Sequence, residues 1–217
     1  MHMPTGAGKT RTAINLICDY LKKKDDLVIW LAHTEELCQQ AYDEFNKGWK
    51  IIGNREVESF KLFKNFRLDI EKITKGFLVM SLDYAYSLTK KSQNLFFKLS
   101  RKCNFVVMDE AHMSIAPSYK QVLDLLVNNK TNLLGLTATP GRAGIDDEEN
   151  ENLANFFNKQ KSTLYVEGFK SPIHFLEKKG YLAKVIPIKL ESNIDIKKIF
   201  SKTEIDTQLK RIRSGQD

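Results

Sequence analysis

Four short apolar runs stand out along the chain. They are Leu27–Ala32, Phe77–Leu82, Phe105–Met108 and Asn132–Leu136. Each run is continuous rather than alternating, and this pattern is typical of parallel strands that are covered by helices on both faces. A weaker pattern predicts one further strand near Val57–Phe60, within a lysine-rich stretch.

The segments between these runs have the spacing of helices, with apolar positions three and four residues apart. Thr34 is a candidate N-cap, and Gly48 a candidate stop, for the second helix. The predicted helices are Thr10–Lys23, Glu35–Lys47, Asp83–Leu99, Ser118–Val127 and a short one between Ser171-Pro172 and Gly180. Alternating strands and helices predict an α/β fold, an open and mostly parallel sheet flanked by helices on both faces.

Three segments near the end of the chain complete the pattern. The acidic run Asp146–Glu151 predicts an exposed loop, and Val185–Leu190 predicts one more strand. The tail to Asp217 is polar and helix-like, without an apolar face of its own.

The composition is that of a globular protein with one large core: 217 residues, 42% hydrophobic and 28% charged. No apolar run approaches the ~20 residues of a membrane helix, and there is no secretory signal, so we expect a cytoplasmic protein without a membrane partner. Cys18, Cys38 and Cys103 lie far apart and form no metal-binding pattern. They predict reduced, buried thiols.

The net charge of +7 is compatible with a polyanionic partner such as nucleic acid. The lysines and arginines are clustered, at Lys22–Lys24, around Lys61–Arg67 and around Lys98–Lys102. Runs of lysine are also common on ordinary solvated surfaces, so charge alone does not identify the partner.

The first chemical signal is Pro4–Thr10 (PTGAGKT), at the start of a predicted helix. Gly6 and Gly8 allow backbone N–H groups to turn towards phosphate oxygens at the positive end of the helix dipole. Lys9 could contact the β- and γ-phosphates, and the Thr10 hydroxyl could ligate Mg²⁺. The full GxxxxGK[ST] pattern has a small residue where this chain has Met3, so a plain glycine turn remains an alternative.

The second signal is Asp109-Glu110, directly after a buried strand. An Asp in this position can hold Mg²⁺ beside a phosphate loop, and the following Glu can deprotonate the attacking water. Two acids alone could simply cap a helix, but the preceding phosphate loop weakens that interpretation. The third segment, Leu136–Pro140 (LTATP), could sense the nucleotide state, although this segment taken alone is better explained as a capped turn.

GAGKT, DEAH and TATP, in this order, resemble motifs I, II and III of superfamily 2 helicases. Ala32–Leu37 resembles motif Ia, and Met80–Asp83 resembles the next nucleic-acid-contacting motif, with Ser81 where the family usually has Thr. The chain is most similar to restriction-enzyme motor subunits and to repair helicases of the RadD and Rad25 types. These share MPTGAGKT, LTATPGR and a GYL stretch like Gly180–Leu182. The resemblance implies a RecA-like P-loop NTPase fold.

The resemblance also implies roles for individual residues, with ATP and Mg²⁺ as cofactors. The implied ATP-binding residues are Thr5, Gly6, Ala7, Gly8, Lys9, Thr10 and Arg11, and the Mg²⁺ ligands are Thr10 and Asp109. The implied catalytic residues are Lys9, Asp109 and Glu110, and those that couple hydrolysis to movement are His112, Thr137 and Thr139. The implied nucleic-acid contacts are His33, Thr34, Ser81 and Asp83.

By this resemblance, residues 1–180 form the first RecA-like domain, without its first strand because only Met1–Met3 precede the loop. Residues 181–217 lead towards a second RecA-like domain of the same parent chain. That domain would supply the arginine finger, so we expect the chain alone to hydrolyse ATP very slowly and to unwind nothing.

The function predicted is an ATP-driven motor on double-stranded DNA, in repair or restriction. An RNA helicase is the main alternative, although RNA helicases usually carry SAT rather than TATP. A small-molecule kinase would not need DEAH followed by TATP. A nucleic-acid-binding module with a decayed ATPase is disfavoured by the intact Lys9, Thr10, Asp109 and Glu110.

Overall fold

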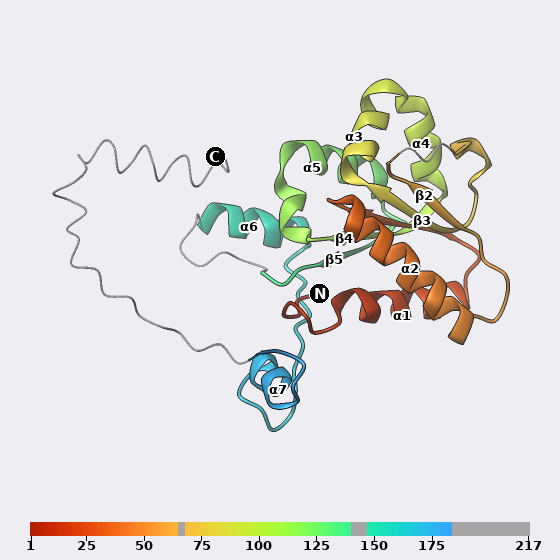
Figure 1. Ribbon diagram of the computed structural model, residues 1–217. Coiled ribbons are helices and arrows are strands. Elements are labelled where there is room, and N and C mark those ends of the chain that lie inside the picture. Colours follow the sequence, from red (N-terminus) through yellow and green to blue (C-terminus); the bar gives the residue numbers. More distant parts are fainter. Residues whose placement is uncertain (65–67, 140–146, 184–217) are drawn as a thin grey trace, which may run out of the picture. The chain divides into compact units, whose positions relative to one another are not determined.

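The computed structural model describes residues 1–64, 68–139 and 147–183, and Met1–Ala183 forms one compact unit (Figure 1). The expected strand Val185–Leu190, the helix-like tail and Arg142 of the LTATPGR segment lie outside the described residues. The division of the chain near residue 180 remains a prediction.

The core of the unit is a five-stranded parallel sheet with the order β2-β3-β1-β4-β5. The strands are β1 (Leu27–Ala32), β2 (Ser59–Leu62), β3 (Gly76–Ser81), β4 (Cys103–Asp109) and β5 (Asn132–Leu136). All six residues of β1 and all six of β3 are buried. This burial confirms that the central strands are covered on both faces.

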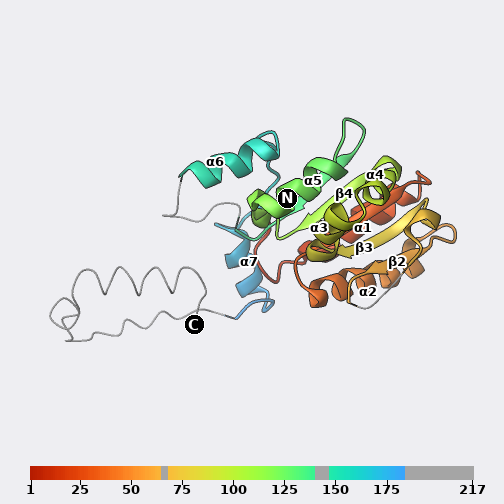
Figure 2. The ribbon, with the colours of Figure 1, turned by 90° about the horizontal axis from the view of Figure 1, so that it is seen from above.

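Helices cover the two faces of the sheet in separate groups (Figure 1). On one face, α1 (Lys9–Leu21) and α2 (Glu35–Ile52) pack on Val28, Trp30 and Val79. On the other face, α3 (Leu82–Lys91), α4 (Gln93–Lys102) and α5 (Pro117–Leu126) pack on Leu31 and Leu78. Figure 2 shows the same elements from above, where the two helix layers overlap across the strands. The predicted fold class is therefore confirmed.

Several predicted boundaries were wrong for local reasons. The single helix Asp83–Leu99 is two helices, because Ser92 has non-helical backbone angles between α3 and α4. Gly48 lies inside α2 rather than after it, and it faces Ile14 and Cys18 of α1. Strand β2 begins two residues later than predicted, at Ser59.

The acidic run is not a loop: α6 (Asp147–Phe156) begins within it. Acidic residues are favourable in the first turn of a helix because of its dipole, and α6 buries Leu153. The short helix predicted after Ser171 is confirmed as α7 (Pro172–Lys178), and the Ser171 hydroxyl accepts from the His174 N–H. No helix in the described ranges has the length and apolar character needed to cross a bilayer.

The residues before the phosphate loop lie beside the carboxyl end of β5. His2 forms parallel bridges to Thr137 and Thr163, and the Met1 ammonium group donates to the Gly135 carbonyl at 2.6 Å. Met3 is buried, and its N–H donates to the Thr137 carbonyl. This pairing joins the phosphate loop to the strand that carries the third motif.

Candidate nucleotide and nucleic-acid site

The phosphate loop has the backbone shape that its glycines permit. Gly6 and Gly8 have φ angles of 76° and 83°, in the left-handed region that favours glycine. Gly8 caps α1, and no described side chain caps that helix end. The N–H groups of its first turn are therefore available to a ligand.

The two glycines differ in their surroundings. A Cβ atom on Gly6 would lie 2.9 Å from Cδ2 of Leu182, so the loop packs against the GYL stretch. A Cβ atom on Gly8 would meet nothing in the described structure within 4 Å. The loop is thus supported on one side and open at the end of α1.

Asp109 lies at the carboxyl end of β4 and is 4% exposed. Burial raises its pKa to about 6, while a hydrogen bond from the Glu110 N–H and the positive charge of Lys9 act in the opposite direction. The charge of Lys9 acts on Asp109 although the two residues are far apart in the sequence. In addition, Asp109 is the register partner of Leu136, and the Met3 N–H just before the loop donates to the next carbonyl, that of Thr137. The phosphate loop and the DEAH segment therefore lie at the same edge of the sheet.

Glu110 and the third motif are connected through His112. Nδ1 of His112 lies 3.4 Å from Oε2 of Glu110 and 3.5 Å from Oγ1 of Thr137. The Thr139 N–H donates to the same Thr137 oxygen at 3.1 Å. The three residues predicted to couple hydrolysis to movement thus form one chain that ends at Glu110.

Glu110 itself has an unusual backbone, with a φ angle of 50°. A non-glycine residue in this region costs about 1–3 kcal/mol and is often found at functional sites. It precedes the short 3-10 helix η2 (Ala111–Ile115).

The residues predicted to contact nucleic acid lie side by side at the same carboxyl edge. Ala32 and Ser81 are register partners on the neighbouring strands β1 and β3. The Thr34 hydroxyl accepts from the Leu37 N–H, and the Ser81 hydroxyl accepts from the Tyr84 N–H, each at 3.3 Å. These two hydroxyls therefore cap α2 and α3.

His33 and Asp83 are both exposed, and Tyr119 connects them. Its hydroxyl lies 3.2 Å from Nδ1 of His33 and 3.3 Å from Oδ1 of Asp83. Sequence reasoning missed this residue, because a tyrosine three and four residues before Val122 and Leu123 in a helix has the pattern of an ordinary core position. His2 was missed for a similar reason: only the fold brings its ring to the Ala138 carbonyl, at 3.2 Å.

This arrangement fits a magnesium-bound nucleotide. A carboxylate and a hydroxyl with several water molecules suit Mg²⁺, which binds few protein ligands and many phosphate oxygens. Asp109 and Thr10 are residues of these two types, and the raised pKa of Asp109 marks a buried carboxylate that a cation would stabilise when ionised. Lys9 and the uncapped start of α1 supply positive charge for the phosphates.

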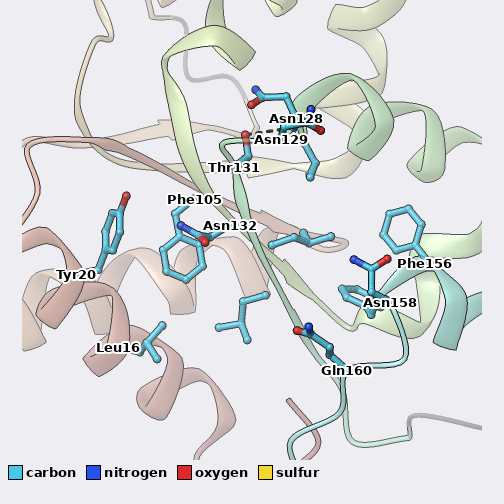
Figure 3. Close-up of a pocket in the computed structure, with 14 residues that line it drawn as sticks. Leu16, Tyr20, Phe105, Asn128, Asn129, Thr131, Asn132, Phe156, Asn158 and Gln160 are labelled. Atoms are coloured by element: carbon cyan, nitrogen blue, oxygen red, sulfur yellow. Dashed lines mark hydrogen bonds between the residues drawn. The ribbon is translucent and has the colours of Figure 1, made fainter.

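A cavity of about 910 Å³ lies elsewhere, along β5 and beside α1 (Figure 3). Leu16, Tyr20 and Phe105 line one part of it, and Phe156 and Gln160 line another. None of the predicted site residues lines this cavity. It is thus separate from the phosphate loop and the DEAH residues.

Residues 1–142 match the family described as type III restriction enzyme, res subunit. The helicase domain of Hef from Pyrococcus furiosus is similar in structure, with a TM-score of 0.56 and 22% identity over 76% of this chain and 34% of that one. The UvsW helicase of bacteriophage T4 has a TM-score of 0.51 and 19% identity, covering 70% of this chain and 50% of that one. No curated protein sequence matches. The chain spans at most half the length of these two structures.

Proposed function

Because the chain belongs to the type III restriction enzyme res subunit family and has the first RecA-like domain fold of superfamily 2 helicases, we propose that it is the ATP-binding domain of a motor on double-stranded DNA. Helicase-family domains of this kind are parts of ATP-dependent enzymes. The observation that carries the proposal is that the residues just before the phosphate loop pair with Thr137, beside the strand end where Asp109 and Glu110 lie, and that the charge of Lys9 acts on Asp109.

In this proposal, residues Thr5–Arg11 hold the triphosphate. The first-turn N–H groups of α1 face the phosphate oxygens, and the ammonium group of Lys9 neutralises charge on the β- and γ-phosphates. Thr10 and Asp109 hold Mg²⁺, which supplies charge stabilisation at the γ-phosphate when it is bound. Gly6 and Gly8 let the backbone adopt the required curvature.

Glu110 orients the attacking water and accepts its proton. The contact between Glu110 and His112 supports a link to Thr137 and Thr139, because a change around the γ-phosphate would alter this chain of contacts. The third motif could then report the nucleotide state to the rest of the enzyme. This is the role proposed for His112 and the two threonines.

Nucleic acid would bind where β1 and β3 end. The N-termini of α2 and α3, capped by Thr34 and Ser81, present positive dipole ends to backbone phosphates. His33 would contact the strand through its ring, while Asp83 is an acid and would suit a sugar hydroxyl or a bound cation rather than a phosphate. Such contacts with the backbone do not read sequence.

Titration with a fluorescent ATP analogue in the presence of Mg²⁺ tests the nucleotide site. Lys9→Ala should abolish binding, whereas Lys23→Ala, at an exposed lysine just past the far end of α1, should not change it. Binding that needs no Mg²⁺, or that survives Lys9→Ala, would contradict the proposal. An absence of binding would instead favour a nucleic-acid-binding module without ATPase function.

The polymer is tested by competition. A labelled DNA duplex should bind the chain and be displaced by unlabelled DNA duplex, but not by RNA of the same sequence at equal concentration. Preferential displacement by RNA would favour the RNA helicase alternative. Both titrations need a stated salt concentration, because phosphate contacts are salt-dependent.

A further inference from the structure

We propose that Tyr119 is a positioning residue that couples nucleic-acid binding at His33 and Asp83 to the segment that carries Glu110. This inference rests on the proposed function, since it concerns how the two halves of that site communicate. The roles predicted from sequence include no residue between the nucleic-acid contacts and the ATPase residues. Tyr119 occupies that place in the structure.

The hydrogen-bond stoichiometry at the phenol defines its role. An ionised Asp83 can only accept, so the single hydroxyl proton of Tyr119 is donated to Asp83. The hydroxyl oxygen then accepts from Nδ1 of His33, which must carry a proton. The phenol thus fixes the orientation of both exposed side chains.

The surroundings of Tyr119 make this contact persistent. Its side chain is 9% exposed and packs in the core cluster on the α5 side of the sheet. The His33 ring also contacts the Tyr119 ring edge-on, at a centroid distance of 6.1 Å. Burial, with the charge of Asp83 adding to it, raises the pKa of Tyr119, so the hydroxyl keeps the proton that it donates.

The backbone of Tyr119 leads directly to Glu110 through a series of hydrogen bonds. The Met113 N–H donates to the Glu110 carbonyl at 2.9 Å, and the Ala116 N–H donates to the Met113 carbonyl at 3.1 Å. The Tyr119 N–H then donates to the Ala116 carbonyl at 3.0 Å. Displacement of His33 or Asp83 by a bound strand would therefore be transmitted to the turn that holds Glu110.

The test uses Tyr119→Phe, which keeps the ring and removes the hydroxyl. The affinity of the chain for a labelled DNA duplex is measured with and without a Mg²⁺-bound, non-hydrolysable ATP analogue. We expect DNA affinity to fall about 3- to 10-fold, the usual worth of one or two hydrogen bonds. The factor by which the analogue changes DNA affinity should approach one, because the variant lacks the contact that links the two sites. DNA should then also leave the affinity for the analogue unchanged, because coupling is reciprocal.

The affinity for the analogue without DNA should stay at the wild-type value in this variant. Tyr20→Phe is the matched control: the Tyr20 hydroxyl also donates to a carboxylate, that of Asp26, at the opposite edge of the sheet. It should leave DNA affinity and coupling unchanged. Asp83→Ala combined with Tyr119→Phe should weaken DNA binding by less than the product of the two single effects, because both remove the same contact.

The possible failures are distinguishable. If the wild type binds DNA and Tyr119→Phe retains its affinity and coupling, the inference is wrong and the proposed function stands. If Tyr119→Phe lowers the affinity for the analogue in the absence of DNA by the same factor, Tyr119 is only structural. If the wild-type chain binds no DNA duplex and no RNA, the proposed function itself fails.

Discussion

Asp109 is a buried carboxylate whose ionisation is opposed by its surroundings, and this has a measurable effect on stability. Burial raises its pKa from 3.8 to about 6, so the folded chain binds this proton more tightly than the unfolded chain does. Between pH 4 and pH 6 the unfolded state loses its proton first, and stability falls as the pH rises. Above pH 6 the loss is complete, at about 3 kcal/mol.

Asp109→Asn removes this cost. Without Mg²⁺, its free energy of unfolding should equal that of the wild type near pH 4 and exceed it by about 3 kcal/mol at pH 7. Urea unfolding at a series of pH values measures the difference. The exposed Asp124→Asn is the control and should show no such trend. A less stable Asp109→Asn variant at pH 7 would show that the acid is stabilised by contacts rather than penalised by burial.

The three cysteines give a second prediction at this scale. Burial raises the pKa of Cys18 to about 11 and those of Cys38 and Cys103 to about 12, so almost no thiolate is present at neutral pH. Iodoacetamide at pH 8 should therefore modify the native chain very slowly and the urea-unfolded chain rapidly, as read by mass spectrometry. Fast modification of any one cysteine in the native state would contradict its burial.

Among elements, the strands were easier to predict than the helix ends. A continuous apolar run such as Leu27–Ala32 needs helices over both of its faces, as in a parallel sheet. The structure matches the predicted bounds of this strand. Helix ends are less visible in the sequence: α2 continues through Gly48, which faces α1, and Ser92 divides two helices without any strong stop signal. The left-handed backbone of Glu110 could not be predicted either, because left-handed angles are usually expected at glycine.

The N-caps allow a prediction for the helices that the proposed function places against nucleic acid. Thr34→Ala removes the hydroxyl that caps α2 and should cost about 1 kcal/mol of stability. Ser171→Ala removes an equivalent cap from α7. If the N-terminus of α2 binds a phosphate, only Thr34→Ala should also weaken DNA binding, as measured by fluorescence anisotropy. Equal DNA affinity in the two variants would remove α2 from the proposed interface.

At the scale of the whole molecule, the order of strands brings the predicted residues together. The carboxyl ends of β3, β1, β4 and β5 follow one another across the sheet. They carry, in that order, the second nucleic-acid motif, motif Ia, the DEAH residues and the third motif. The sequence predicts each motif, but the adjacency of motif Ia to DEAH, and so the role of Tyr119, follows only from this topology.

One RecA-like domain alone is expected to bind nucleotide but to hydrolyse it slowly. If an arginine finger from a second RecA-like domain completes the nucleotide site, this chain should bind Mg²⁺ and ATP. It should nevertheless hydrolyse ATP about 10³- to 10⁵-fold more slowly than a complete enzyme of this kind. Phosphate release, measured with and without DNA duplex, gives this rate. Glu110→Gln should abolish the residual rate and keep nucleotide affinity, because the amide cannot accept the proton from water. Rapid, DNA-stimulated hydrolysis by the 217-residue chain would mean that its own residues complete the site.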